Sequence, residues 1–153
     1  MIAPNLGQNR NAVPAQFGLR DVPLNRAGTR RDMTKRLLIV DDEVDFANFV
    51  SSASATFGYD VKVCHDCASA RDTLDEFMPD LMVLDIVMPG EDGIEFLNWF
   101  SSQSFEAKVI LVTGYNPHYM EMAQKLSALS GTKVITTLQK PVHLQDLRNA
   151  LSA

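Results

Sequence analysis

The stretch LMVLDIVMPGEDG, at residues 81–93, decides the fold. It opens as an apolar run of strand length, continues directly into Asp85, and then reverses at the turn residues Pro89, Gly90 and Gly93. A carboxylate on the last residue of a buried strand lies at the carboxyl edge of the sheet, where open α/β folds place their chemistry. We therefore expect Asp85 to project into a crevice at that edge.

A second apolar run, LLIV at residues 37–40, ends directly in Asp41, Asp42 and Glu43. If the two strands are parallel neighbours, Asp41 and Asp42 converge on Asp85. Two carboxylates about 4 Å apart repel by roughly 4 kcal/mol at an effective dielectric near 20, so a cation is expected to offset them. Hard oxygen ligands in a small cluster favour Mg²⁺. The alternative, that the two aspartates only cap the following helix, explains one carboxylate but not three.

From Arg36 onward, apolar runs of strand length alternate with amphipathic segments of helix length, which indicates repeated βα units and a parallel sheet. The expected strands are residues 36–40, 59–64, 81–84, 108–112 and 133–138, and the expected helices are residues 44–57, 67–77, 94–101, 117–130 and 144–151. The sequence thus predicts an α/β fold of five strands and five helices.

Several residues are typical of helix ends. Asp66 is placed to cap the second helix, Asn116 with Pro117 opens the fourth, and Gly58 and Gly131 close the first and fourth. The apolar spacing of the first helix gives one face toward the sheet, formed by Phe46, Phe49, Val50, Ala53 and Phe57. We interpret these aromatic residues as core, and Trp99 and Phe100 in the third helix likewise.

The bulk properties favour one acidic globular domain. The net charge of -5 and the sequence pI near 5.1 argue against affinity for nucleic acid or an anionic membrane, because both require a basic surface. No apolar stretch is long enough to span a bilayer and no secretory signal opens the chain, so we expect a cytoplasmic protein. Residues 1–34 contain five arginines and no strand or helix period, and we expect a disordered basic extension before a domain at residues 35–153.

Cys64 and Cys67 form a C-x-x-C motif around His65, which suggests a redox pair or half of a zinc site. Structural zinc requires four ligands, and the chain has no second cysteine pair. We therefore interpret both as structural thiols, in keeping with a reducing compartment.

Two further polar residues follow strands. Thr113 comes after the fourth apolar run, and Lys140 with Pro141 follows the fifth. A hydroxyl and an ammonium beside three carboxylates suit phosphoryl transfer onto Asp85, with Mg²⁺ and Lys140 neutralising the phosphoryl oxygens and Thr113 donating a hydrogen bond. No general base is needed, because an aspartate is already ionised near neutral pH.

Residues 35–153 resemble the receiver domain of bacterial two-component response regulators. The matching motifs are LLIVDDE from Leu37, DIVMPGEDG from Asp85, VTG from Val112 and KP at Lys140. The resemblance implies a flavodoxin-like, doubly wound parallel sheet with strand order 2-1-3-4-5. It also implies that a histidine kinase or histidine phosphotransfer protein phosphorylates Asp85. Mg²⁺ is then bound by Asp42, Asp85 and the backbone carbonyl of Val87, with indirect help from Asp41.

By the same resemblance, Thr113 and Lys140 contact the phosphoryl group, and the Lys140–Pro141 peptide bond is cis. One position departs from the family pattern. Receivers usually carry Tyr or Phe three residues before the lysine, and here that place is Thr137. We expect the phosphorylation chemistry to survive, whereas the signal is transmitted by loop or helix movement or through another surface.

Because the chain ends at Ala153, directly after the last expected helix, we expect a stand-alone receiver with no DNA-binding domain and no enzymatic activity beyond its own phosphorylation and dephosphorylation. It would act through phosphorylation-dependent contact with an unknown downstream protein. The alternatives are a phosphate shuttle or sink in a phosphorelay, or a pseudo-receiver that binds partners without phosphate. A homodimer stays open. A phosphatase of the haloacid dehalogenase type is disfavoured, because Val87 stands where its second carboxylate belongs.

Overall fold

The computed structural model describes residues 34–114, 116–130 and 134–153. The predicted extension at residues 1–34 lies outside this range apart from Thr34, and the predicted helix stop at Gly131 lies outside it as well. The strands are β1 (Arg36–Val40), β2 (Asp60–Cys64), β3 (Leu81–Asp85), β4 (Lys108–Thr113) and β5 (Val134–Gln139). The helices are α1 (Val44–Ala55), α2 (Cys67–Phe77), α3 (Gly93–Ser102), α4 (Pro117–Ser130) and α5 (Leu144–Leu151).

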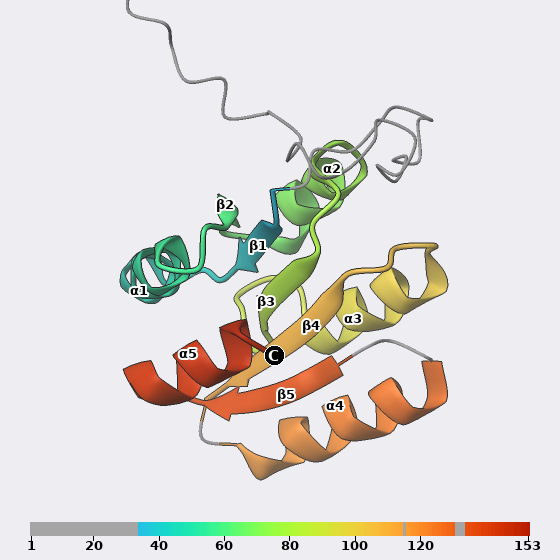
Figure 1. The fold of residues 1–153 in the computed structure, drawn as a ribbon. Coiled ribbons are helices and arrows are strands. Elements are labelled where there is room, and N and C mark those ends of the chain that lie inside the picture. Colours follow the sequence, from blue (N-terminus) through green and yellow to red (C-terminus); the bar gives the residue numbers. More distant parts are fainter. Residues whose placement is uncertain (1–33, 115, 131–133) are drawn as a thin grey trace, which may run out of the picture. The chain divides into compact units, whose positions relative to one another are not determined.

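The five strands form one parallel sheet in the order β2-β1-β3-β4-β5, which confirms the predicted doubly wound fold (Figure 1). Its central strands are apolar on both faces, as expected where helices cover both sides. Alternate residues of β1 show the division: Leu37 and Ile39 pack with α1 and α5, whereas Leu38 and Val40 pack with α2, α3 and α4. The core therefore has two layers, one on each side of the sheet.

The register of the sheet brings the strand ends together. Val40 pairs with Leu84, and the next residues in the two strands, Asp41 and Asp85, therefore lie side by side. Asp85 in turn pairs with Val112, and Thr113 pairs with Gln139, the residue before Lys140. All the polar residues that the sequence analysis placed after strands consequently lie along one edge of the sheet.

The helix ends largely follow the expected signals. The Asp66 side chain accepts a hydrogen bond from the Ser69 N–H at 2.7 Å, and the Asn116 side chain accepts one from the His118 N–H at 3.1 Å. Helix α1 ends at Ala55, two residues before the predicted limit. The reason is that the Gly58 N–H donates to the Ala55 carbonyl while Gly58 adopts a positive φ of 73°, which turns the chain toward β2.

The aromatic residues of α1 and α3 belong to the core, as interpreted from the sequence. Val50 and Ala53 are buried, and Phe46, Phe49 and Phe57 are partly buried against the same cluster. On the other face, Phe100 is buried and Trp99 packs against the core. None of the helices in the described part of the chain is long and apolar enough to cross a membrane.

Candidate functional site

Asp85 ends β3 as a buried carboxylate, with 3% of its surface exposed. Its Oδ1 accepts a hydrogen bond from the Val87 N–H at 3.0 Å, and its Oδ2 accepts one from the Lys140 Nζ at 3.0 Å. The main chain of Gly93 lies close to the same strand end, and a Cβ there would stand 2.6 Å from the Asp85 carbonyl oxygen and from the Ile86 Cα. Glycine is therefore required at position 93 for the turn that presents Asp85.

The loop after Asp85 is also anchored to α2. Arg71 forms a two-pronged ion pair with Glu91, in which its Nη1 lies 2.6 Å from Glu91 Oε2. The guanidinium lies over two aromatic rings, 5.4 Å from the centroid of Phe96 and 4.9 Å from that of Trp99. The hydrogen bonds from Arg71 lower the pKa of Glu91. Arg71 thus links the loop to α2, while its guanidinium packs on two aromatic rings of α3.

Asp41 is completely buried beside Asp85. Its Oδ1 accepts a hydrogen bond from the Glu43 N–H at 2.8 Å, whereas its Oδ2 is buried and receives no hydrogen bond, although the Lys140 Nζ is 3.0 Å away. Helix α1 has Glu43 at its N-cap, and that side chain makes no capping hydrogen bond. The alternative that Asp41 and Asp42 cap the helix is therefore wrong, because neither occupies the capping position.

Burial and neighbouring negative charge both disfavour the ionised forms of Asp41 and Asp85. Burial raises the pKa of Asp41, and the Asp85 charge adds to the rise, although the hydrogen bond from the Glu43 N–H and the nearby Lys140 ammonium oppose it. Burial likewise raises the pKa of Asp85, with a further contribution from the charge of Asp42, against the opposing hydrogen bonds from the Val87 N–H and Lys140. One ammonium does not neutralise this group of carboxylates, so the group keeps an excess of negative charge.

Carboxylate oxygens of Asp41, Asp42 and Asp85 all lie within 4.8 Å of one another. Three hard oxygen donors at such spacing, one of them a buried oxygen without a hydrogen bond, fit the preferences of Mg²⁺. Val87 follows Asp85 in the loop and is 48% exposed, with its N–H directed to Asp85. The residues present therefore fit a magnesium ion, and the Val87 carbonyl as its ligand stays a prediction.

Lys140 places its ammonium among the carboxylates, as expected for a lysine that follows the fifth strand. Its side chain is 16% exposed, and its Nζ lies 2.7 Å from Glu43 Oε1 and 3.0 Å from both Asp41 Oδ2 and Asp85 Oδ2. Burial alone would lower the pKa of Lys140, but the interactions of its ammonium with the carboxylates of Glu43, Asp41 and Asp85 outweigh burial and raise the pKa. The Lys140–Pro141 peptide bond is cis, as the resemblance implied.

Thr113 is completely buried at the end of β4. Its carbonyl accepts a hydrogen bond from the Lys140 N–H at 2.8 Å, which ties the fourth and fifth strand ends together. The Thr113 hydroxyl has only a long contact of 3.4 Å to the Gly114 carbonyl. This hydroxyl therefore has donor capacity for a group placed at the strand edge.

Three contacts of this site do not follow from the sequence patterns. The Glu43 carboxylate, from the motif after the first strand, makes the shortest of the three ion-pair contacts with Lys140. The Phe46 ring packs partly against the core, and the Lys140 Nζ lies 4.4 Å from its centroid. The Nδ1 of His65, which stands between the two cysteines, lies 2.9 Å from the Asp41 carbonyl oxygen. Only contacts between distant parts of the chain reveal these roles.

The cysteines stand apart from this chemistry. Cys64 and Cys67 are both free and buried. Burial raises the pKa of the Cys67 thiol to about 11, so that little reactive thiolate forms at neutral pH. Within the described residues, the group of potential metal ligands consists of three aspartates and includes neither cysteine. These observations agree with structural thiols.

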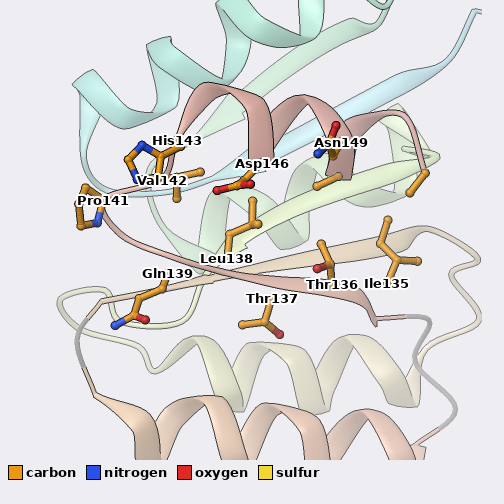
Figure 2. Close-up of a pocket in the computed structure, with 12 residues that line it drawn as sticks. Ile135, Thr136, Thr137, Leu138, Gln139, Pro141, Val142, His143, Asp146 and Asn149 are labelled. Atoms are coloured by element: carbon orange, nitrogen blue, oxygen red, sulfur yellow. The ribbon is translucent and has the colours of Figure 1, made fainter.

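The departure at Thr137 leaves open space beside β5. Thr137 points toward α4 and Leu138 toward α5 (Figure 2). A hollow of about 600 Å³ lies between β5 and α5, and another of about 450 Å³, lined by Met120, Gln124 and Thr137 among others, lies between α4 and β5. A threonine fills less of this space than an aromatic ring. The strand is also irregular, because Ile135 is an extra residue between the pairs Val109–Val134 and Ile110–Thr136.

Comparison with known proteins gives a consistent result. The family model described as the response regulator receiver domain matches residues 37–152. The response regulator receiver protein CpdR of Brucella abortus is 33% identical over 117 residues, which cover 76% of this chain and 93% of that protein. The sporulation initiation phosphotransferase F of Bacillus subtilis is 29% identical over 119 residues, which cover 78% of this chain and 92% of that protein.

A longer relative and a solved structure extend the comparison. The transcriptional regulatory protein TrcR of Mycobacterium tuberculosis is 39% identical over 92 residues, which cover 60% of this chain but only 35% of that protein. The crystal structure of a CheY-like response regulator receiver domain from Methanospirillum hungatei superposes with a TM-score of 0.68 at 23% identity, covering 78% of this chain and 91% of that one. This structural likeness supports the fold.

Proposed function

Because this chain belongs to the response regulator receiver domain family of two-component signalling, we propose that it accepts a phosphoryl group on Asp85 in a Mg²⁺-dependent reaction. One observation carries the proposal. The buried Asp85 carboxylate stands at the carboxyl edge of the sheet with two further aspartates and the Lys140 ammonium directly around it. A nucleophile and the groups that neutralise an incoming phosphoryl group are thereby in one place.

The proposed reaction transfers a phosphoryl group from a phosphohistidine to Asp85. A carboxylate oxygen of Asp85 forms the new bond to phosphorus as the phosphorus–nitrogen bond breaks, and the imidazole keeps the electron pair of that bond. The Val87 N–H holds Oδ1 of the nucleophile at 3.0 Å. Lys140 and the Thr113 hydroxyl are placed to bind phosphoryl oxygens.

The metal ligands we propose are Asp42, Asp85 and the Val87 carbonyl, with Asp41 acting indirectly. Mg²⁺ bound there supplies positive charge for the phosphoryl oxygens. The chain's own contribution is to keep Asp41 and Asp85 buried and close despite their repulsion, so that the ligands are in position before the cation arrives.

The proposed donor is a histidine kinase or a histidine phosphotransfer protein, and the proposed output is phosphorylation-dependent contact with a downstream protein rather than catalysis on a separate substrate. The likeness to a sporulation initiation phosphotransferase over 92% of its length supports a second candidate, a shuttle or sink in a phosphorelay. We place the protein in the cytoplasm, which its two free cysteines support. The lifetime of the phosphorylated form distinguishes a receiver that acts on a downstream protein from a phosphate shuttle or sink.

The test is the intact mass of the protein after incubation with acetyl phosphate and Mg²⁺. We expect a single phosphate adduct in the wild type. The control variant Asp45→Asn, which replaces an exposed aspartate in the first turn of α1, should give the same adduct. The adduct should be absent in Asp85→Asn and after addition of EDTA. If neither acetyl phosphate nor a histidine kinase labels the wild type, the proposal is wrong and a pseudo-receiver takes its place.

A further inference from the structure

Two residues of α1's N-terminal end surround the Lys140 ammonium. Glu43 Oε1 lies 2.7 Å from the Lys140 Nζ, and the Phe46 ring centroid lies 4.4 Å from it. Glu43 and Phe46 are three residues apart, so they lie on the same side of the helix start. We call these two residues the lysine clasp.

We propose that the lysine clasp holds Lys140 back from a phosphoryl group on Asp85 and thereby slows phosphorylation of this chain, an inference that rests on the proposed function. An ammonium has three N–H donors. In the described structure, three carboxylates surround it: those of Asp41, Glu43 and Asp85. Lys140 donates hydrogen bonds to Glu43 and Asp85, and Asp41 Oδ2 lies 3.0 Å from the same Nζ, so a phosphoryl oxygen that binds Lys140 competes with these carboxylates for the ammonium.

Glu43 is the competing member of this set. Asp41 and Asp85 are buried, with side chains 1% and 4% exposed, and they keep Lys140 near the reaction centre without help from Glu43. The Glu43 side chain is 61% exposed. It can hydrate fully when released, so its contact with Lys140 is the one that a phosphoryl group displaces most readily. Glu43 is thus a positioning residue that acts through Lys140.

The structure allows Glu43 to be replaced without disturbing the helix. Its side chain makes no capping hydrogen bond, and the hydrogen bond of residue 43 to Asp41 Oδ1 comes from the backbone N–H. Glu43→Ala keeps that backbone contact and removes only the clasp carboxylate. Asp45→Ala is the matched control, since it removes an exposed carboxylate from the same helix turn. Phe46→Leu removes the ring but keeps an apolar side chain against the core.

The experiment measures the rate of phosphorylation of the full chain by acetyl phosphate and by phosphoramidate, with excess Mg²⁺. We expect Glu43→Ala to raise the rate about two- to fivefold with both donors, the factor equivalent to one partly exposed ion pair. Phe46→Leu should raise it up to about threefold, and Asp45→Ala should leave it unchanged. Acetyl phosphate carries more negative charge than phosphoramidate, so weaker repulsion of the donor would favour acetyl phosphate, whereas an equal gain with both donors shows release of Lys140.

The outcomes separate this inference from the proposed function. An unchanged or slower rate in Glu43→Ala, or an equal gain in Asp45→Ala, overturns the lysine clasp while phosphorylation of Asp85 stands. Failure of the wild type to be labelled overturns both.

A second measurement follows the side-chain ammonium signal of Lys140 by ¹⁵N NMR, assigned with Lys140→Arg. We expect it to broaden in Glu43→Ala and not in Asp45→Ala, and an unchanged signal refutes the clasp even without any phosphodonor.

Discussion

Replacement of Lys140 by methionine is the perturbation whose effect on stability follows most directly from the structure. Methionine keeps most of the side-chain length and removes the charge. Asp41 and Asp85 would then remain buried without the ammonium that lies 3.0 Å from each of them. Removing one partner of a fully buried ion pair costs roughly 3–5 kcal/mol. Because Lys140 is 16% exposed and the carboxylates can take up protons, we expect a loss of about 2–3 kcal/mol at neutral pH.

The loss of stability in Lys140→Met should depend on pH, whereas a loss caused by a packing defect would not. Burial first, and neighbouring carboxylates second, raise the folded-state pKa of Asp41 and Asp85 above the ordinary value of 3.8. The folded state therefore binds protons more tightly, and stability falls as pH rises from about 3.8 through the raised pKa values. Loss of Lys140 raises them further, so the deficit of Lys140→Met should shrink as the pH is lowered toward 5.

The assay is urea unfolding of the wild type and Lys140→Met in the presence of EDTA, at neutral pH and near pH 5. The raised pKa of Lys140 itself adds no slope there, since its contribution to stability is complete below the unfolded-state value of 10.5. Arg148→Met, on the exposed side of α5, is the control. A loss below about 0.5 kcal/mol, or a loss that is the same at both pH values, would refute the reasoning that Lys140 compensates buried charge.

Three further predictions concern the metal, the turn and the loop. Excess Mg²⁺ should raise the unfolding free energy of the wild type by about 1–3 kcal/mol in thermal or urea unfolding, and Asp42→Asn should abolish the gain, because the cation binds only the folded cluster. Gly93→Ala should cost about 3 kcal/mol in urea unfolding, since its Cβ would stand 2.6 Å from main-chain atoms, whereas Gly114→Ala, with open space around it, should cost less than about 1 kcal/mol. Arg71→Ala should cost about 1 kcal/mol and speed hydrogen exchange in the loop after Asp85, as the ion pair and the aromatic contacts are lost; unchanged exchange would contradict its anchoring role.

The sequence predicted the fold and the centre of the site because both depend on local signals. Apolar runs of strand length identified the strands, and a polar residue after a run meets the polar residues of neighbouring strands once the sheet is parallel. The sequence therefore predicts that Asp41, Asp85 and Lys140 converge, and in the structure the Lys140 Nζ lies 3.0 Å from both carboxylates. The cis peptide bond before Pro141 came from the family resemblance alone.

The remaining features depend on contacts that local patterns do not encode. Glu43 and Lys140 are 97 residues apart in sequence, and their contact requires the register of the four strands β1, β3, β4 and β5 as well as the start of α1. The extra residue at Ile135 changes the pairing of β5 with β4, and no turn residue in the strand predicts this irregularity. Likewise, the partner of Arg71 lies 20 residues away in a loop whose path no periodicity predicts.

Asp85 is the residue that we propose to carry the phosphoryl group. The most direct measurement is borohydride reduction of the protein after incubation with a phosphodonor and Mg²⁺, which converts an aspartyl phosphate to homoserine, followed by mass spectrometry of the peptides. We expect homoserine at position 85 and at no other aspartate. Homoserine at Asp41 or Asp42 instead, or none in a sample that a histidine kinase has been shown to label, would contradict it.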